Sequence, residues 1–445
     1  MQLELFEDKG NGEISLEDVF EAYFECRRNK RRTANALAFE ADYESRLIEL
    51  WKDINSGVYQ PGKSIAFIVT EPVKREVFAA DFRDRVVHHL IIRKLNPLFE
   101  ARFIEDSYSC REGKGTQYGI GRVASFIREC SENYTKDCYI LKMDIQSFFM
   151  SIDKGILFKY LKEFILNHYF GEDKNLIVDL VEKVVFNAPE DNCLIKGRRS
   201  DWIGLPASKS LFTVAKNKGM PIGNLTSQIF ANFYLNFFDR YVKDECGVKY
   251  YGRYVDDFVI VHPDKEYLLG LKENLKTYIY AKLRLRLHPK KVYLQHYTKG
   301  VKFIGAVIKP GREYIGNRTK GNFYAKIIHF NREWDASAER QLRTERRQQT
   351  ECSQGGGRRS LAADMLASIN SYLGFMIHYK TFKIRRKMLE KYLLPIWKRY
   401  VYVGENLEKI VLKERYKPMP VKLKKLRRRK CVSGSGKNEA FLPAA

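Results

Sequence analysis

The chain has 445 residues, a mass of 52.2 kDa and a formal net charge of +25, with an isoelectric point near 9.5. This length allows two or three subdomains with a substantial core. The positive excess favours a polyanionic partner, but it does not separate RNA from DNA, and a ribosomal or architectural protein would share it.

Several classes of protein are disfavoured. The start of the chain has no basic segment followed by an apolar one, and no run of about 20 apolar residues occurs, so we expect neither a secretion signal nor a membrane span. The eight cysteines include no Cys-x-x-Cys pair. This spacing argues against a zinc site and predicts reduced thiols in a cytoplasmic protein.

The N-terminal part of the chain predicts helices and then a group of cations. Residues 14–49 have a charged, helical pattern that begins after Ser15, a typical N-cap residue followed by an acidic turn. Lys74, Arg75 and Arg111 lie in polar segments further on and are suited to phosphate contacts. Each of them alone would more often be a solvated surface charge.

An apolar run at residues 139–143 ends at Asp144 and predicts a buried strand. Ser147 could begin a helix directly afterwards, so Asp144 taken alone is equally well an N-cap. Phe149 follows on the floor where a sugar would rest, and its ring there would clash with a 2′-hydroxyl and favour deoxynucleotides. The alternative for Phe149 is a plain core residue.

Residues 187–219 are rich in Lys, Gly, Ser and Pro and predict a mobile excursion. After them, Gly223 and Asn224 predict a turn into a helix from Leu225 to Asp239, whose N-terminus would face a nucleotide or template. Gln228 would lie one turn into that helix, where its amide would contact a base or sugar, or merely cap the helix.

Two β-prone runs meet at Asp256 and Asp257 and predict a hairpin with both carboxylates at its tip. Such a pair is most often a solvated turn. With Asp144 on a neighbouring strand, however, the carboxylates form the set that a two-metal site requires. We therefore predict two Mg²⁺ ions, with Mn²⁺ as a substitute, at the three aspartates and at Ile145.

The C-terminal part of the chain is predicted to be helical from about residue 306, and residues 368–374 lie in an apolar-periodic helix suited to gripping a duplex. Residues 333–360 are strongly polar and predict a long loop or disordered insertion. Residues 422–430 are nearly all lysine and arginine and predict nonspecific phosphate binding by a flexible tail.

These motifs resemble those of reverse transcriptases over roughly residues 71–305. Residues 71–87 are similar to the first fingers motif of that family and residues 107–115 to the second. Residues 287–291 resemble its lysine-bearing motif, and residues 302–305 its primer-grip hairpin. The resemblance implies an α+β right-hand polymerase fold, with fingers, a palm of antiparallel sheet and helices, and a helical thumb.

The implied domains follow the motifs in chain order. They are an N-terminal helical region with the fingers at 1–138, the palm at 139–305 with its insertion at about 187–219, the thumb at 306–420 with its polar loop at about 333–360, and a basic flexible tail at 421–445.

One motif narrows the family. Most reverse transcriptases carry Gln-Gly-x-x-x-Ser-Pro where this chain has Ile222 in place of the glutamine and Gln228 in place of the proline. That variant resembles reverse transcriptases of diversity-generating retroelements. The resemblance implies an RNA-directed DNA polymerase, a nucleotidyltransferase that copies a template-repeat RNA into cDNA with adenine-biased errors for mutagenic retrohoming.

The partners implied by this resemblance are the template-repeat RNA, a cDNA–RNA duplex, dNTPs and a basic accessory variability protein that could be oligomeric. It implies a cytoplasmic, bacterial, archaeal or phage-encoded enzyme with no membrane contact.

The resemblance also implies a role for individual residues. The catalytic set is Asp144, Asp256, Asp257 and Lys290, and Lys291 is an equal alternative to Lys290 as the proton donor to pyrophosphate. Ile222 would loosen fidelity, or it would be a packing residue without effect on errors. The other assignments are Lys74, Arg75, Arg111, Phe149 and Gln228 for the dNTP, Ile222, Gly223 and Gln228 for fidelity, and Tyr254, Val255, Phe303 and Gly305 for primer and template.

Three alternatives remain. A retron or group II intron reverse transcriptase shares the core, but the chain has no zinc-knuckle or His-Asn-His nuclease tail, and the variant at Ile222 and Gln228 argues against it. An RNA-dependent RNA polymerase would share the paired acids, but Phe149 disfavours ribonucleotides. A non-catalytic nucleic-acid-binding scaffold descended from a polymerase would not need all three carboxylates.

Overall fold

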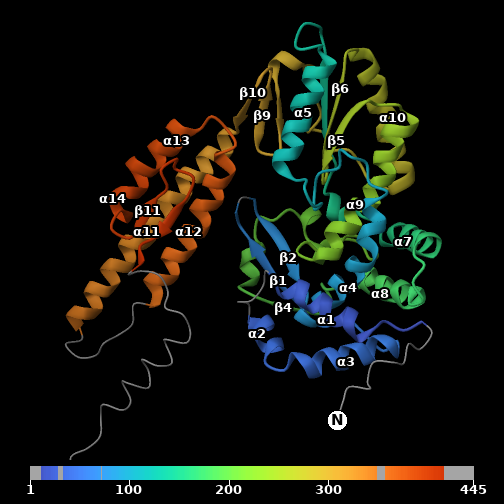
Figure 1. Cartoon of the computed structure of the whole chain (residues 1–445), viewed down its shortest axis with the longest axis horizontal. Coiled ribbons are helices and arrows are strands. Elements are labelled where there is room, and N and C mark those ends of the chain that lie inside the picture. The colour runs from blue at the N-terminus through green and yellow to red at the C-terminus, as the bar shows by residue number, and fades with distance from the viewer. Residues whose placement is uncertain (1–11, 29–33, 72, 348–355, 415–445) are drawn as a thin grey trace, which may run out of the picture. The chain divides into compact units, whose positions relative to one another are not determined.

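The structure is a computed structural model of the chain, and it describes residues 12–28, 34–71, 73–347 and 356–414. The chain divides into two compact units, Met1–Glu313 and Tyr314–Ala445, which Figure 1 colours from blue at the N-terminus to red at the C-terminus. Each unit buries its own set of apolar side chains.

A four-stranded antiparallel sheet lies at the centre of the first unit, with the order β5-β6-β3-β7. Its strands are β3 (Tyr139–Asp144), β5 (Tyr250–Tyr254), β6 (Asp257–His262) and β7 (Tyr293–His296). Phe258 to Val261 of β6 are all buried, because helices cover both faces of the sheet. In Figure 1, α5 (Thr116–Cys130) covers one face and α10 (Lys265–Leu283) the other.

The other helices of the first unit surround a large apolar core. Among them, α9 is buried along most of its length and packs against α4, as its continuous apolar sequence predicts. The predicted helix at 225–239 is thereby confirmed, as is the N-cap at Ser15, whose hydroxyl accepts the Asp18 N–H. These helices are α1 (Leu16–Arg27), α2 (Ala34–Glu40), α3 (Tyr43–Asn55), α4 (Phe82–Glu100), α6 (Phe148–Ser151), α7 (Lys154–His168), α8 (Lys174–Phe186) and α9 (Leu225–Arg240).

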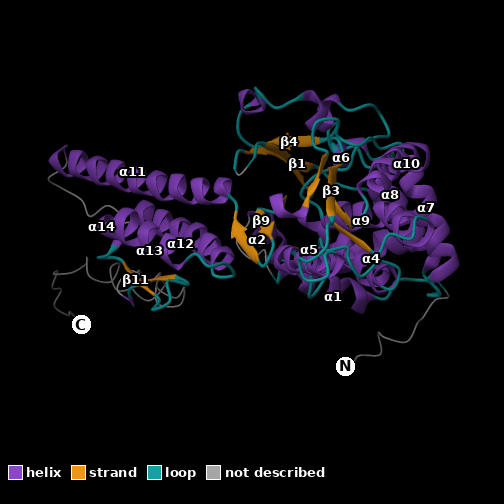
Figure 2. Ribbon diagram, turned by 90° about the horizontal axis from the view of Figure 1, so that it is seen from above, coloured by secondary structure: helices purple, strands orange, loops and turns teal. Residues whose placement is uncertain are grey.

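A second sheet joins residues 64–79 to the segment at 187–219. Strand β1 (Ser64–Val69) pairs antiparallel with β2 (Arg75–Ala79) and parallel with β4 (Cys193–Ile195), and Figure 2 shows β1 and β4 side by side. The carboxylate of Glu76, 1% exposed, accepts hydrogen bonds from Trp202 Nε1, Ser210 Oγ and Leu211 N at 2.6–2.7 Å.

The prediction of a mobile excursion at 187–219 therefore needs correction. The composition of this segment is that of a loop, but a strand and the buried Glu76 carboxylate fix it to the second sheet. A buried carboxylate keeps its place only when donors surround it, and the donors come from this segment.

A third sheet has the order β10-β9-β8, and the boundary between the two units falls within β10. Its strands are β8 (Val301–Phe303), β9 (Ala306–Lys309) and β10 (Arg312–Ile315).

The second unit consists mainly of helices. Its core includes the rings of Trp334 and Trp397, whose centroids are 4.4 Å apart, and the two long helices α11 and α12 run side by side (Figure 2). The helix predicted at 368–374 lies within α12 and is confirmed. The elements are α11 (Asn317–Arg347), α12 (Gly356–Met376), α13 (Phe382–Lys387), α14 (Leu394–Trp397) and the antiparallel pair β11 (Val401–Val403) and β12 (Ile410–Leu412).

The polar loop predicted at about 333–360 is wrong for the residues that the structure describes. Helix α11 continues to Arg347 and α12 begins at Gly356. High polarity misled the prediction, because Glu, Arg, Gln and Ala are strong helix formers even without an apolar face. Residues 348–355 and the tail at 421–445 lie outside the described residues. The predicted domain limits stay predictions, and no described helix is both long and apolar enough to cross a membrane.

Candidate active site

Three carboxylates meet at one edge of the central sheet. Asp144 is the last residue of β3 and stands opposite Asp257, the first residue of β6. The Ile145 N–H donates to the Asp256 carbonyl oxygen at 3.0 Å, which places Asp256 beside them. Val255, in the turn between β5 and β6, has a φ of 55°. The predicted hairpin with both acids at its tip is therefore present.

A buried ion pair fixes this hairpin to helix α9. The Arg253 guanidinium is fully buried and pairs with Asp239 of α9 at 2.6 Å. Its Nη1 also donates to the carbonyl oxygen of Val255 at 2.9 Å, so α9 is tied to the turn itself. The Tyr251 hydroxyl donates to the same Asp239 carboxylate. A charge pair with its remaining hydrogen bonds satisfied fixes the tip rigidly.

Burial and mutual repulsion set the charges of the carboxylates. Burial, followed by the Asp144 carboxylate, raises the pKa of Asp256 to about 6, and burial also raises the pKa of Asp257. Two lysines partly offset this effect. Lys142 Nζ lies 2.9 Å from Asp257 Oδ2, and Lys291 Nζ lies 2.9 Å from Asp144 Oδ2.

The donor set has the chemistry of a site for a hard divalent cation. Carboxylate oxygens are the ligands that Mg²⁺ prefers, and Asp257 Oδ1 is buried without a hydrogen-bond partner. Ile145 is buried and offers only its backbone carbonyl. Among the described residues, no three His, Cys, Asp or Glu side chains lie close enough together to hold a metal ion. One oxygen each of Asp144 and Asp257 instead contacts a lysine.

The carboxylates open into a cavity of about 660 Å³. Phe149 and Ile222, both half-buried, contribute apolar walls. Charge comes from Arg75, the first residue of β2, and from Lys74 just before it, whose Nζ donates to the Ile203 carbonyl oxygen at 2.6 Å. The residues predicted for the site that line this cavity are Lys74, Arg75, Asp144, Ile145, Phe149, Ile222, Tyr254, Val255, Asp256 and Asp257.

Two residues predicted to bind the dNTP are not part of this cavity. The Arg111 side chain, 6% exposed, binds Glu100 at 2.8 Å and the carbonyl oxygens of Ile104 and Ser107, so its guanidinium is committed to internal partners. Gln228 is exposed on α9 and accepts from Cys110 Sγ at 3.2 Å. The structure therefore does not support either residue as a ligand of the nucleotide in this conformation.

Other predicted residues also lie off the cavity wall. Phe303 is 1% exposed, and Ile304 rather than Phe303 or Gly305 lines the cavity. Gly223 has a φ of 121°, and a Cβ there would lie 2.8 Å from Val77 Cγ1. Because Gly223 has no side chain, β2 can approach the start of α9 closely.

The structure separates two lysines that the sequence left equivalent. Lys291 lines the cavity and binds Asp144, and Lys290 does neither. Lys142 was missed, although its position two residues before Asp144 puts both side chains on the same face of β3, which is a readable signal. Arg253 was also missed, because its partner Asp239 lies on another element.

The comparison with known proteins establishes the family. Residues 74–308, more than half of the chain, match the family described as reverse transcriptase (RNA-dependent DNA polymerase). The chain therefore belongs to the reverse transcriptase family. The enzyme class of that family is RNA-directed DNA polymerase, and the predicted α+β polymerase fold is confirmed.

Individual relatives are distant. Protein YkfC of Escherichia coli (strain K12) is 22% identical over 305 residues, covering 61% of this chain and 73% of that protein. A telomerase from Candida tropicalis truncated from the C-terminal domain gives a TM-score of 0.40 at 13% identity over 55% of this chain. A telomerase from Candida albicans in complex with a fragment of telomeric RNA gives 0.40 at 12% identity over 81%. The matches cover 53% and 63% of those telomerase chains.

Proposed function

We propose that the chain is an RNA-directed DNA polymerase that copies a template-repeat RNA into cDNA with errors concentrated at adenines. The observation that carries the polymerase activity is the meeting of Asp144, Asp256 and Asp257 at one sheet edge, where all three line a cavity of about 660 Å³ and one buried Asp257 oxygen has no hydrogen-bond partner. Family membership supports the same reaction.

In this proposal, different residues of the cavity have different roles in the reaction. Asp144, Asp256 and Asp257 would hold Mg²⁺, which when bound lowers the pKa of the primer 3′-hydroxyl and neutralises the triphosphate. Lys74 and Arg75 balance charge on the phosphates. The Phe149 ring excludes a 2′-hydroxyl, and Lys291 gives a proton to the departing pyrophosphate.

The diversity-generating assignment rests on the sequence variant at Ile222 and Gln228. Ile222 lines the cavity and packs against the apolar cluster of Ala66, Phe78, Met150 and Leu211. A side chain on the cavity wall is the kind that would affect a templating base pair, which supports this part of the proposal. The partners in this proposal are the folded template-repeat RNA, the cDNA–RNA duplex and a small basic accessory protein. None of the six cysteines described in the structure forms a disulfide, which supports action in a reducing cytoplasm.

The test is primer extension on a defined RNA template with Mg²⁺ and dNTPs, followed by sequencing. We expect DNA with errors opposite template adenines, and no product from the Asp256→Asn/Asp257→Asn variant. Accurate DNA would retain polymerase activity but favour the retron or group II intron type. A product from the double variant would overturn the assignment of the carboxylates.

A second measurement addresses fidelity alone. The Ile222→Gln exchange is expected to lower the error frequency at adenines while leaving DNA synthesis in place. The matched control is Cys193→Ala, which alters the same apolar cluster at a residue that lines neither the candidate active site nor the cavity beside it. An unchanged error spectrum in Ile222→Gln would remove Ile222 from the fidelity mechanism.

A further inference from the structure

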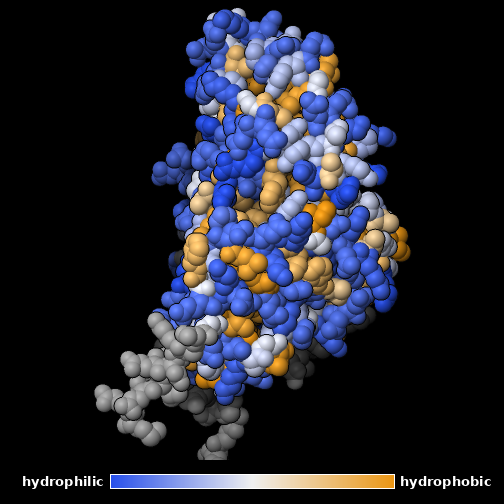
Figure 3. Space-filling view, turned by 90° about the vertical axis from the view of Figure 1, so that its right-hand side faces the viewer, coloured by the Kyte–Doolittle hydropathy of each residue, from blue (hydrophilic) through white to orange (hydrophobic). Residues whose placement is uncertain are grey.

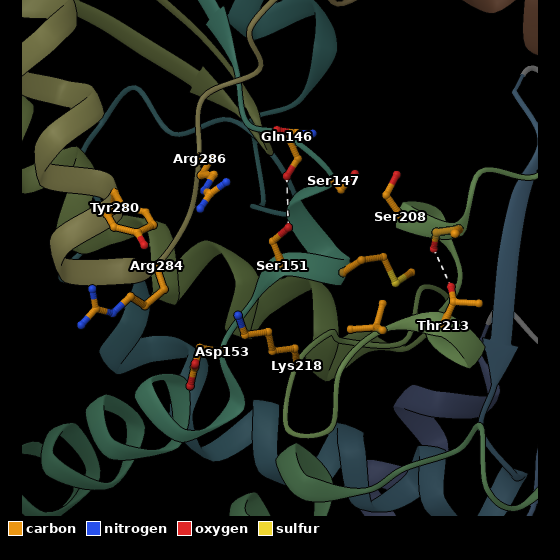
Figure 4. A pocket seen from close by; sticks show the side chains of 13 residues that line it. Gln146, Ser147, Ser151, Asp153, Ser208, Thr213, Lys218, Tyr280, Arg284 and Arg286 are labelled. Carbon is orange, nitrogen blue, oxygen red and sulfur yellow. Dashed lines mark hydrogen bonds between the residues drawn. The ribbon is translucent and has the colours of Figure 1, made fainter.

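A second cavity, of about 620 Å³, adjoins the candidate active site (Figure 4). Gln146, Ser147, Met150 and Ser208 line both cavities, so the segment that follows Asp144 forms a wall between them. In Figure 4, Tyr280, Arg284 and Arg286 lie on one side of the second cavity, and Ser208 and Thr213 lie on the opposite side.

This cavity carries an excess of positive charge. Arg284, Arg286 and Lys218 line it, against one carboxylate, Asp153. The Asp153 carboxylate accepts the Ile156 N–H at 3.1 Å as the N-cap of α7, so one of its oxygens is already engaged. Across the residues that the structure describes, none of the three cations forms an ion pair. Three cations in a concave surface concentrate positive potential there.

Both arginines are held in place by the same ring. The Arg284 and Arg286 guanidinium carbons lie 5.7 and 5.4 Å from the centroid of Tyr280. Arg284 has a φ of 54° at the end of α10, where its N–H bonds the Tyr280 carbonyl oxygen at 3.0 Å. The Arg286 carbonyl oxygen accepts from Gln146 N at 2.9 Å, which connects this side of the cavity to the wall shared with the catalytic carboxylates.

We propose that this cavity is a binding site for a chain of phosphates. Guanidinium groups match phosphate oxygens in pairs, and the hydroxyl groups of Ser147 and Ser208, which also line the cavity, supply further donors. The ligand is the triphosphate of an arriving nucleotide or the pyrophosphate that departs. A nucleic-acid strand fits less well, because Tyr280 is the only aromatic ring among the residues that line the cavity, and a strand held by stacking needs rings for successive bases.

Binding is tested directly by calorimetry on the full chain, without a divalent metal, using inorganic tripolyphosphate and pyrophosphate. The variant is Arg284→Gln/Arg286→Gln, and the matched control is Lys282→Gln, an exposed cation in the last turn of α10 that does not line the cavity. We expect the dissociation constant to rise by about tenfold or more in the double variant and to stay unchanged in the control. Equal binding by all three proteins would overturn the site, and so would an equal loss in the control. Loss of affinity for a 20-nucleotide RNA alone would also overturn it.

The role of the site rests on the proposed polymerase function, whereas the binding test does not. In primer extension, a raised KM for dNTPs in the double variant would assign the arriving triphosphate. A weakened inhibition by pyrophosphate at unchanged KM would assign the departing product. Loss of phosphate binding without either kinetic change would overturn a role in catalysis. If the wild-type chain made no DNA, the calorimetry would still decide whether the site exists.

Discussion

At the scale of single residues, the candidate site is a balance of three carboxylates and two lysines. Asp144 and Asp257 each give one oxygen to a lysine, Lys291 or Lys142, at 2.9 Å. These contacts lower the repulsion between acids that are close and partly desolvated. Because each lysine contacts a different acid, replacing one lysine is expected to remove the counter-charge of that acid alone.

The two adjacent lysines give the sharpest residue-level prediction. Lys291→Gln is expected to lower the rate of nucleotide addition by about 10² or more, because this ammonium lies in the cavity beside Asp144 and is placed to donate a proton. Lys290→Gln removes the same charge one position away and is expected to leave the rate within about twofold. Single-turnover extension at saturating dNTP measures both. Equal losses would show that the position of the charge does not matter.

The three aspartates that the sequence placed together do lie together in the structure, and the predictions for them share one physical basis. Asp144, Asp256 and Asp257 follow from strand periodicity and a turn, which are local patterns. The assignment of Arg111 and Gln228 to the nucleotide stays a prediction, and neither side chain lines the cavity, because the partners of a side chain are not set by local sequence. Arg111 meets Glu100 of α4, and the phase of α9 points Gln228 away from the cavity.

At the scale of elements, the hairpin of β5 and β6 depends on α9 through the pair of Arg253 and Asp239. Both side chains are 0% exposed, so the pair is shielded from water. Replacing Arg253 or Asp239 alone leaves the other as an uncompensated buried charge, whereas replacing both leaves no buried charge there. The pair also positions the turn, because Arg253 binds the Val255 carbonyl oxygen.

The Arg253→Met variant is expected to lose about 3–5 kcal/mol of the free energy of unfolding, since Asp239 would stay buried without its cation. Urea unfolding monitored by circular dichroism measures this loss. The Arg253→Met/Asp239→Leu double variant is expected to recover part of the stability but little polymerase activity, because the Val255 carbonyl stays without its donor. A single variant as stable as the wild type would mean that the pair does not contribute to stability.

Helix α4 contains a second buried acid with a predictable pH response. Asp84 is 2% exposed and accepts hydrogen bonds from the Tyr59 hydroxyl and the Gly62 N–H, and burial raises its pKa to about 6. The folded state thus keeps a proton that the unfolded state has lost between its ordinary pKa of 3.8 and about 6. The free energy of unfolding therefore rises as the pH falls through about 6, and this contribution is lost above it.

Comparing the wild type with the Asp84→Asn variant isolates the contribution of the Asp84 carboxyl to the pH dependence of stability. From about pH 7.5 to about pH 5, the wild type is expected to gain about 1.4 kcal/mol of unfolding free energy relative to the variant. Urea unfolding at the two pH values measures the difference. A constant difference between the two proteins would show that Asp84 keeps an ordinary pKa.

The elements themselves were predictable to different degrees. The hairpin and α9 follow from alternating or continuous apolar sequence, and both are present where predicted. The fixed position of residues 187–219 was not predictable, because it depends on Glu76, more than one hundred residues earlier in the chain. The first part of α11 was predicted as helix, and its residues 333–347 were predicted as loop because the prediction weighed polarity above helix propensity.

At the scale of the whole molecule, charge is the property that bears most directly on function. The net charge is +25, and the face in Figure 3 is mostly hydrophilic with scattered apolar patches. Beyond the two lysine contacts in the candidate site, the cavity with Arg284 and Arg286 adds cations without ion pairs in the described part of the chain. An excess of this size attracts phosphate from any nucleic acid and is not specific to sequence.

Affinity for single-stranded RNA is therefore expected to fall steeply with salt. If about six phosphates are neutralised, the logarithm of the association constant should fall by about 4 per tenfold rise in salt concentration, because each contact releases a bound counterion. Fluorescence anisotropy with a labelled 30-nucleotide RNA, from about 50 to about 300 mM salt, measures the slope. The Asp256→Asn/Asp257→Asn variant should show the same slope, since these two residues would act at the nucleotide and would not contact the phosphates along the RNA strand. A slope near zero would contradict charge-driven binding, and RNA recognition would then have to depend on uncharged contacts with bases.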